Sequence, residues 1–587
     1  MTHRNITGAR PASQFLRSTA CAWALAAGWL LSACGGGGGS AAPPPSPPPP
    51  DPAPVIAGCS LLYPLSNPAR TGAIDPLLDA QWHLQPANVA SGTQGLGVTL
   101  AWTHAQGRGV RVAIIDGPVE TSNADLSPNA LAGQSFDYRL NSATEPLPCN
   151  ADSAGSHGTA VAGILAAARS NGFAGAGVAP LASIVAYNAI ESGIRAEIAR
   201  QRIAHALDRN PLNAIYNLSW GSDDDGALHP ADAAIAAAIE RGVQSGRGGL
   251  GTLYVFASGN GGCLGGGTDQ TVVPPRCRYR DMTGFDGHLN LPGTITACVV
   301  DRDGNLPLWA EEGENLLVCG LSSNSAGNQG ITTLAPGNTT RNDFGGASAA
   351  APMVSGVIAL MLEVQPQLSW REVRTILAET ARENRPDDPS WSATELQKWP
   401  PQQLAGQPVR KRFSRRFGFG VVDAAAAVER AAGFTPASAP GTTLRACEKS
   451  ARPEITLSDP ADSGLVWASN RLDIDANDLA AGGCPSVVEW VEVFFSATHP
   501  YAADLQIELV SPSGQVSRLA DSRACGGVDK ISSNSGEDRC GSYSGWRFMA
   551  NRHLGESSLG NWTLRVADAV AGDIGTWDRW TLKLSGR

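Results

Sequence analysis

The sequence is short of positive charge and of long apolar runs. Its 587 residues include 44 Lys and Arg against 54 Asp and Glu, a formal net charge of −10. An acidic surface disfavours nucleic acid and anionic lipid headgroups as partners and favours cationic ones. The apolar stretch from Ala20 to Leu31 has 12 residues, too few to cross a bilayer, and no other segment is expected to cross one.

The first 58 residues are predicted to direct export and to act as a tether. Arg4, Arg10 and Arg17 precede the apolar stretch, which is the charge pattern of a signal peptide. Its end, Leu-Ser-Ala-Cys34, resembles a bacterial lipobox. We therefore expect cleavage after residue 33 and lipidation of Cys34, with an ordinary signal peptide and a chance cysteine as the alternative. Residues 34–58, rich in Gly and Pro, predict an extended tether.

This interpretation predicts an outer-membrane lipoprotein, or a cell-surface or extracellular protein, that contacts a membrane only through its lipid. Removal of the signal peptide leaves 41 basic against 54 acidic residues, a net charge of −13. Ten cysteines remain after Cys21 and Cys34, an even number that predicts disulfides in an exported protein. Proximity suggests the pairs Cys263–Cys277, Cys298–Cys319 and Cys525–Cys540, although the sequence does not fix the connectivity.

Two different periodicities divide the remaining chain. Before residue 428, apolar strands alternate with helical runs; the strands are expected at 110–115, 182–187, 214–218 and 253–257, and the helices at 159–168, 196–208, 231–244 and 370–380. This alternation predicts a parallel sheet with helices on both faces and a ligand site at the carboxyl ends of the strands. After a linker, the period becomes two over residues 488–494, 505–509, 562–566 and 580–584, which is typical of an antiparallel sandwich. The predicted domains are 59–432 and 446–587, with 433–445 between them.

A serine among small residues marks the first candidate functional position. Ser348 precedes a run that is apolar on nearly every side through Leu362, and such a helix is buried. Pro352 is expected in about the first turn, where its missing N–H costs least. The positive end of the helix dipole then faces Ser348, which suits a nucleophile that must form an oxyanion. An ordinary helix-capping serine is the alternative.

Three further motifs support the catalytic interpretation. Asp116 ends a predicted strand, His157 is expected just before a helix of small residues, and Asn260 follows another strand between glycines. A strand-end cap and a core histidine are the ordinary explanations for the first two. The order Asp, His, Ser is nevertheless that of subtilisin, and an Asn amide can donate to a developing oxyanion.

The motifs around these residues resemble the subtilases, and among them the kexin and furin group. The similarity lies in residues 116–117, 157–159, 215–221, 241–251, 257–262 and 346–352, with Ala347 departing from the usual Thr. Residues 499, 504–505, 511–514, 555–556 and 560–562 resemble the P/Homo B domain of convertases. The resemblance implies a subtilisin-like α/β catalytic domain followed by an all-β, jelly-roll-like sandwich, acting as a serine endopeptidase.

The same resemblance implies roles for individual residues. Asp116, His157 and Ser348 would form the triad, with Asn260 in the oxyanion hole. Ser219, Trp220 and Gly221 would bind substrate, while Asp224 and Asp286 would line a primary pocket selective for Arg or Lys. Gly117 stands where convertases have a second Asp, and acids for the more distant basic subsite are not evident near Ile203 or His229. We therefore expect polypeptide substrates with a basic residue before the cut and a weaker dibasic demand.

Calcium and a folding partner are implied in the same way. A first Ca²⁺ site would use Asp75, Asp125, Ala168, Asn171, Phe173 and Gly175, and a second would use Asp224, Asp281 and Glu311. Carboxylates and loop carbonyls suit this hard cation. Only about 40 residues separate Cys34 from Asp75, too few for the usual subtilase prodomain, so a folding chaperone in trans is expected.

Two other functions compete with this prediction. The chain could be a broad-specificity subtilase without a basic preference, or a catalytically silent adhesin that binds through its sandwich. The presence of all four catalytic motifs argues against the silent form.

Overall fold

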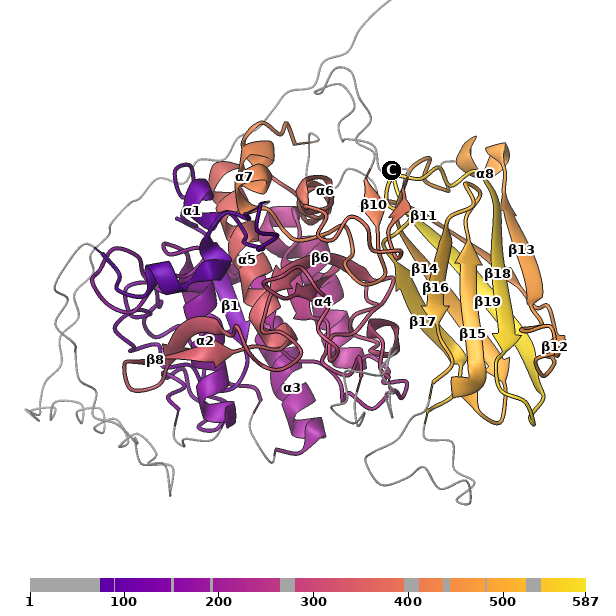
Figure 1. Cartoon of the computed structure of the whole chain (residues 1–587), viewed down its shortest axis with the longest axis horizontal. Helices are drawn as coiled ribbons and strands as arrows, with labels where there is room; N and C mark the ends of the chain where they lie inside the picture. The colour runs from indigo at the N-terminus through magenta and orange to yellow at the C-terminus, as the bar shows by residue number, and fades with distance from the viewer. Residues whose placement is uncertain are drawn as a thin grey trace, which may run out of the picture. The chain divides into compact units, whose positions relative to one another are not determined.

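The computed structural model describes residues 74–88, 90–148, 153–190, 194–263, 280–394, 411–436, 444–480, 483–523 and 540–587. The predicted signal peptide, the tether and the lipidation of Cys34 lie outside these ranges. Within them the chain forms an α/β domain followed by a β-sandwich (Figure 1).

A six-stranded parallel sheet forms the centre of the α/β domain. Its strands are β1 (Arg111–Ile115), β2 (Ser183–Tyr187), β3 (Ile215–Leu218), β4 (Leu253–Ala257), β5 (Thr294–Val300) and β6 (Leu316–Leu321), in the order β2-β1-β3-β4-β5-β6. The four strands expected from the sequence are confirmed to within one residue. Because all six are parallel, their carboxyl ends share one edge of the sheet, the expected position of a ligand site.

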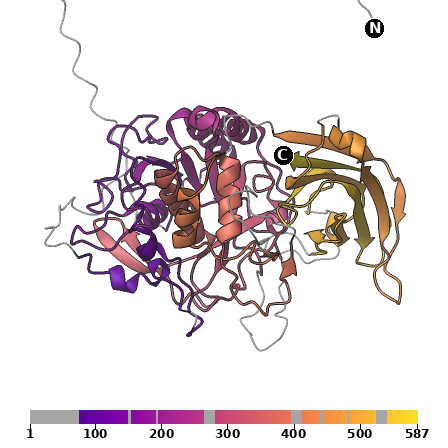
Figure 2. The same cartoon turned by 90° about the horizontal axis from the view of Figure 1, so that it is seen from above.

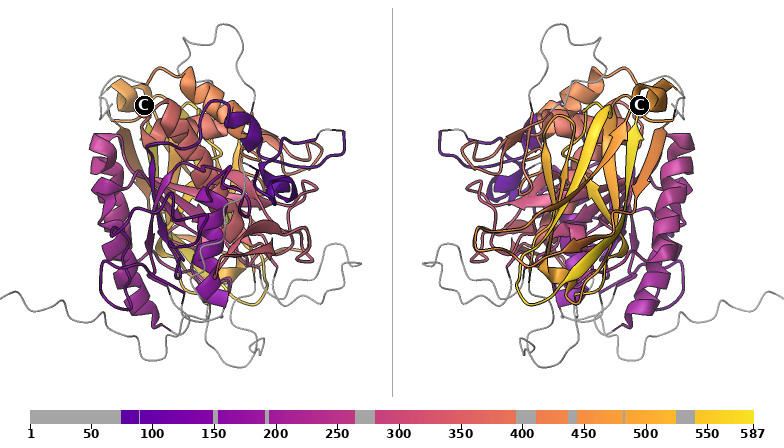
Figure 3. Two further views of the ribbon diagram at one scale, coloured as in Figure 1. Left: turned by 90° about the vertical axis from the view of Figure 1, so that its left-hand side faces the viewer. Right: turned by 90° about the vertical axis from the view of Figure 1, so that its right-hand side faces the viewer.

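Helices cover both faces of this sheet, as the alternation of strands and helices predicted. Alternate residues of β1 face two different apolar cores, one on each side of the sheet. Val112 and Ile114 lie in the core that also contains residues of α2 (Ser153–Ala166), α5 (Ala347–Val364), α6 (Trp370–Thr380) and α7 (Ala424–Ala432). Ala113 and Ile115 share the other with α3 (Ala196–Leu207) and α4 (Ala233–Ser245). Figure 3 shows these last two helices, in purple and magenta, along one flank of the domain. The short α1 spans Val98–Ala101.

Helix α5 is the predicted buried helix, and it packs against α7. Figure 2 shows the α/β domain that contains both helices next to the sandwich, which is drawn in orange and yellow. It is long and apolar enough to pass for a membrane span, but 83% of it is buried inside the protein. The position expected for Pro352 was wrong. Because the helix begins at Ala347, the proline is its sixth residue and lies in the second turn, where its missing N–H leaves the carbonyl of Ser348 without a helical donor.

The carboxyl-terminal domain is an antiparallel sandwich of two sheets, as the period-two pattern predicted. One sheet has the order β11-β19-β14-β17, with β12 also paired to β19, and the other has the order β13-β18-β15-β16. The strands are β11 (Arg445–Ala451), β12 (Ile455–Leu457), β13 (Ala468–Ile474), β14 (Val488–Thr498), β15 (Leu505–Val510), β16 (Val516–Ala520), β17 (Ser544–Ala550), β18 (Gly560–Asp568) and β19 (Gly575–Gly586). The short helix α8 spans Ala476–Ala480. Outside the sandwich, β7 (Ile331–Ala335) pairs with β8 (Thr339–Phe344), and β9 (Ser392–Ala393) with β10 (Arg412–Phe413).

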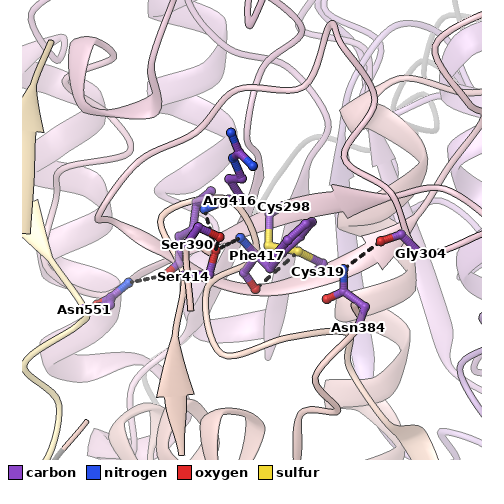
Figure 4. The surroundings of a disulfide bond; sticks show 10 residues. Cys298, Gly304, Cys319, Asn384, Ser390, Ser414, Arg416, Phe417 and Asn551 are labelled. Carbon is purple, nitrogen blue, oxygen red and sulfur yellow. Dashed lines mark hydrogen bonds between the residues drawn. A yellow bond between two sulfur atoms is a disulfide. The ribbon is translucent and has the colours of Figure 1, made fainter. Parts of the chain in front are cut away.

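Disulfides lie within each domain. Cys298 and Cys319 are bonded across adjacent strands β5 and β6, as predicted, and Figure 4 shows their surroundings. Cys447 is bonded to Cys484, a pair that proximity did not suggest. Cys263 and Cys540 are also disulfide-bonded, but Cys277 and Cys525, their predicted partners, lie outside the described residues.

Ion pairs and a shared apolar contact join the two domains. Arg371 donates to both carboxylate oxygens of Glu489, at 2.7 and 2.6 Å, and Arg552 donates to both oxygens of Glu314, at 2.9 and 3.1 Å. The rings of Trp370 and Trp490 lie 5.3 Å apart. Such two-pronged arginine contacts fix orientation as well as distance, so the sandwich is held in one position against the sheet domain.

Candidate active site

Asp116, which is buried, and His157, which is partly exposed, form an acid–imidazole pair at the carboxyl edge of the sheet. Asp116 directly follows β1, and its Oδ1 lies 2.7 Å from His157 Nδ1 and accepts the Gly117 N–H at 2.7 Å. Burial lowers the pKa of His157, but the charge of Asp116 and its hydrogen bond outweigh burial, so the pKa lies above the usual value. The pair can therefore hold a proton on Nδ1 and leave Nε2 to exchange one.

The local structure around His157 differs from the expectation. We expected the histidine just before a helix, but it lies inside α2, which begins at Ser153. A Cβ added to Gly158 would lie 2.5 Å from the Gly117 carbonyl oxygen and 2.7 Å from that of Pro118. The glycine is needed there because α2 packs directly against the loop that carries Asp116.

Ser348 is the second residue of α5 and is tied to strand β3. Its carbonyl, which Pro352 leaves without a helical donor, accepts from Ser219 Oγ at 3.1 Å, while its own Oγ donates to the Ser219 carbonyl at 3.3 Å. Among the described residues the Ser348 hydroxyl is not hydrogen-bonded to His157. Such catalytic hydrogen bonds are often long in structures without substrate and tighten when substrate binds.

Asn260 lies three residues beyond β4 and faces the start of α5. The side-chain Oδ1 of Asn260 accepts the Ala347 N–H at 2.8 Å, which fixes the orientation of the side-chain amide. The backbone N–H of Asn260 donates to Asp224 Oδ1 at 3.3 Å. With the oxygen so held, Nδ2 is the atom left for a further hydrogen bond beside Ser348. That is the chemistry required of an oxyanion donor.

A cavity of about 90 Å³ lies between Ser348 and the acidic residues predicted for the primary pocket. Its lining combines the predicted substrate-binding residues, the predicted oxyanion residue, the predicted nucleophile and five acids. Among the lining residues are Ser219, Trp220, Gly221, Asp224, Asn260, Asp281, Asp286, Glu311 and Ser348. The Asp286 carboxylate accepts the Ser222 N–H at 2.9 Å and the His288 N–H at 2.8 Å. Burial raises the pKa of Asp286, but the hydrogen bond and charge of His288 outweigh it, so this carboxyl remains ionised.

Ser222 and His288 were not singled out in the sequence. His288 stands two residues after Asp286, a common spacing for a side chain that hydrogen-bonds its neighbour, and its Nδ1 lies 3.1 Å from Asp286 Oδ1. The lining of a second cavity, of about 600 Å³, includes the apolar side chains of Ile203 and Trp220 and the imidazole of His229. Asp232 also lines this cavity, although no acid for the more distant basic subsite was evident near Ile203 or His229 in the sequence. The Asp232 carboxylate already has a partner, because Arg200 Nε lies 3.5 Å from it.

Asp224, Asp281 and Glu311 each have atoms close to Gly261. A Cβ added to this glycine would lie 2.6 Å from Asp281 Cβ, 2.9 Å from Asp224 Cβ and 3.2 Å from Glu311 Oε1. Burial, and then the charges of its two neighbours, raises the pKa of Glu311 well above its usual value; burial raises that of Asp281 to about 7. Three desolvated carboxylates suit a hard cation, although no group of three such ligands converges on one point within the described residues.

The residues of the other predicted calcium site are also brought together. Asp75 accepts the backbone N–H groups of Ser170 and Asn171 at 2.7 and 2.9 Å. Asn171 Nδ2 donates to Asp125 Oδ1 at 2.6 Å, and the Ala168 N–H donates to the Asp125 carbonyl at 2.7 Å. The loop carrying Ala168, Asn171, Phe173 and Gly175 therefore closes on both carboxylates. A cation would require the Asn171 amide to present its oxygen instead of its nitrogen.

Comparison with known proteins agrees with this geometry. Residues 107–420 match the subtilase family, and residues 488–584 match the proprotein convertase P-domain. The chain belongs to the subtilase family. In this subtilase the family match includes β1 to β6 and all four predicted catalytic residues.

The subtilase is similar to fungal processing proteases. It is 32% identical over 514 residues to "Protease KEX1" of Kluyveromyces lactis, covering 87% of this chain and 60% of that relative. It is 32% identical over 532 residues to "Dibasic-processing endoprotease" of Schizosaccharomyces pombe, covering 90% and 67%. Its fold matches the crystal structure of the Aeromonas sobria serine protease in complex with the chaperone, with a TM-score of 0.70 at 21% identity, covering 91% and 99%. The chain thus spans about three fifths of the length of the first of these relatives.

Proposed function

We propose that this subtilase is a serine endopeptidase that cleaves polypeptides after Arg or Lys. The observation that carries the proposal is one cavity lined by Ser348, Asn260 and the ionised carboxylate of Asp286, at the sheet edge where Asp116 is paired with His157. A nucleophile, an amide donor and a counter-ion for a basic side chain would thereby surround one scissile bond.

The proposed mechanism is acyl transfer. Ser348 Oγ attacks the carbonyl carbon, and Nε2 of His157 takes its proton while Asp116 holds the Nδ1 proton. The oxyanion is stabilised by Asn260 Nδ2 and by backbone N–H groups at the start of α5, where the helix dipole is positive. The protonated His157 then gives its proton to the leaving amine. Water, deprotonated by the same imidazole, releases the acyl group and regenerates Ser348.

Selectivity would come from the buried acids. The planar guanidinium of a substrate arginine can donate to Asp286 and Asp224 together, whereas a neutral side chain cannot make these charge-assisted hydrogen bonds. Gly117 supplies no acid beside the catalytic pair, and Asp232 is already neutralised by Arg200. We therefore retain a strong preference for the residue before the cut and a weaker dibasic demand, although a processing protease such as that of Schizosaccharomyces pombe is named for dibasic sites.

Calcium belongs to this proposal as a structural ion. The first site would be held by Asp75, Asp125, Asn171 and the carbonyl groups of the 168–175 loop, and the second by Asp224, Asp281 and Glu311. The cation would neutralise the buried carboxylates and fix the loops next to the pocket. It takes no part in bond cleavage.

Export and assisted folding complete the proposal. Lipidation at Cys34 would place the protease at an outer membrane or cell surface, and its acidic surface agrees with a membrane contact through the lipid alone. The structural neighbour from Aeromonas sobria is described in complex with a chaperone. We propose by analogy that a separate exported protein assists folding of this chain.

A panel of peptidyl amides that differ only in the residue before the cut tests this function. The parent chain should hydrolyse the arginyl and lysyl members and lose that activity in Ser348→Ala. Equal rates across the panel would instead support a broad-specificity subtilase. No hydrolysis by the folded, calcium-loaded chain would support a silent binding protein.

A further inference from the structure

The sandwich domain contacts the back of the primary pocket. The Leu228 N–H donates to the Cys540 carbonyl at 2.9 Å, and Trp546 Nε1 donates to the Gly284 carbonyl at 3.1 Å. Arg523, three residues beyond β16, donates through Nε to the Gly226 carbonyl at 2.5 Å. These contacts hold the 224–229 and 283–288 loops, both of which contribute to the lining of the cavity beside Ser348.

Phe285 connects Arg523 to the pocket. The Arg523 guanidinium carbon lies 3.6 Å from the centroid of the Phe285 ring, a close cation–π contact. Phe285 is 1% exposed and belongs to the same apolar cluster as Val493 and Phe548 of the sandwich. The next residue, Asp286, points its carboxylate into the cavity. Because Phe285 and Asp286 are adjacent in the chain, the packing of the Phe285 ring restrains the backbone from which Asp286 projects.

Gly226 gives Arg523 a second route to the pocket acids. The Gly226 N–H donates to Asp281 Oδ2 at 2.9 Å, while its carbonyl accepts from Arg523. Burial raises the pKa of Asp281 to about 7, and the positive charge of Arg523 opposes that rise. Within its own domain the Arg523 side chain makes one long hydrogen bond, 3.4 Å from Nη1 to the Tyr543 hydroxyl, and its buried Nη2 has no hydrogen-bond partner among the described residues. The guanidinium is thus directed at the catalytic domain.

We propose that Arg523 is a positioning residue for substrate selectivity. Through Phe285 and Gly226 it fixes the loops that carry Asp286 and Asp224, so the sandwich takes part in recognising the basic side chain before the cut. This inference rests on the proposed function and deepens it. A purely structural role, in which Arg523 only joins the domains, would change stability without changing the preference among substrates.

The test compares full-length variants with two amides that have Arg or Leu before the cut. The ratio of their kcat/KM values, measured on one preparation, does not depend on the fraction of folded enzyme. In Arg523→Met we expect the Arg/Leu ratio to fall about tenfold, mainly through KM for the arginyl amide. Arg471→Met, at an exposed arginine of β13, is the matched control and should leave the ratio unchanged.

Arg523→Lys separates charge from geometry, because lysine keeps the charge but lacks the planar fork. It should also lower the ratio; full rescue by lysine would overturn the role of the planar guanidinium. An unchanged ratio in Arg523→Met, or an equal loss for both amides, would reduce Arg523 to a domain contact. If Arg523→Met does not fold by circular dichroism, Phe285→Leu tests the same contact with the same expected fall. Failure of the parent to cleave the arginyl amide would refute the proposed function itself.

Discussion

His83 makes the stability of this protein sensitive to acid. Its side chain is fully buried, and neither ring nitrogen has a hydrogen-bond partner among the described residues. Burial lowers its pKa from 6.5 to about 3. The folded state therefore binds this proton less readily than the unfolded chain. The stability that comes from burying His83 in its neutral form is complete above pH 6.5. It declines as the pH falls below that value and is fully lost only below about pH 3.

These two pKa values give the size of the effect. Between pH 8 and pH 5 the free energy of unfolding should fall by about 2 kcal/mol on account of His83 alone. The raised pKa of Asp281 acts in the opposite direction, because protonation of that carboxyl favours the folded state. The prediction therefore concerns the difference between two chains, in which shared contributions cancel.

Urea unfolding followed by tryptophan fluorescence at pH 8, 6.5 and 5 measures this difference. The Ser348→Ala chain serves as parent, because it cannot digest itself if the proposed mechanism holds. From pH 8 to pH 5 the parent should lose about 2 kcal/mol more than the same chain with His83→Phe. His104→Phe, at an exposed histidine, should follow the parent. Parallel curves for the parent and His83→Phe would refute the reasoning.

Three further predictions concern the pocket, calcium and the sandwich. Asp286→Asn should reduce kcat/KM more for an arginyl than for a leucyl amide, since truncating one partner of a buried charge pair costs about 2–5 kcal/mol; equal losses would remove Asp286 from the pocket. Calcium at one hundred times the Kd of a site should add about 2.7 kcal/mol of stability for each occupied site. Glu311→Gln should lose the gain from the second site, and the exposed control Glu429→Gln should keep the whole gain; an unchanged response in Glu311→Gln would reject the second site. Residues 59–432 should give little active enzyme in an oxidising compartment with calcium, while 59–587 should be active, because the sandwich covers Trp370 and Phe285. Equal activity would show that the sandwich is dispensable, and activity only after addition of another exported protein would support the chaperone.

The sequence predicted those features that depend on local pattern. The strand Leu253–Ala257 and the helix Trp370–Thr380 were placed correctly because each has a continuous period and clear ends. The start of α2 was missed because Gly155 and Gly158 are poor helix formers, and close packing of Gly158 on the Asp116 loop overrides that propensity.

Features that depend on distant contacts could not be derived in this way. The position of Pro352 follows from the bond between Ser219 and the Ser348 carbonyl, 129 residues apart in the chain. Cys447 and Cys484 are 37 residues apart, so proximity gave no reason to pair them. Arg523 gave no local signal, since its partner Gly226 is 297 residues away. The candidate site residues were predictable from their motifs, but the contacts that position them were not.

The proposed activity requires Ser348 to be a nucleophile activated by His157 in a pocket for basic side chains. Treatment of the full-length chain with a peptidyl arginyl phosphonate, followed by mass spectrometry, detects such a nucleophile by its covalent adduct. We expect one adduct per chain, on Ser348, slowed strongly in His157→Ala and formed much less readily from the leucyl phosphonate. An adduct on another residue, or equal labelling of the His157→Ala chain, would show that Ser348 is not the nucleophile that His157 activates.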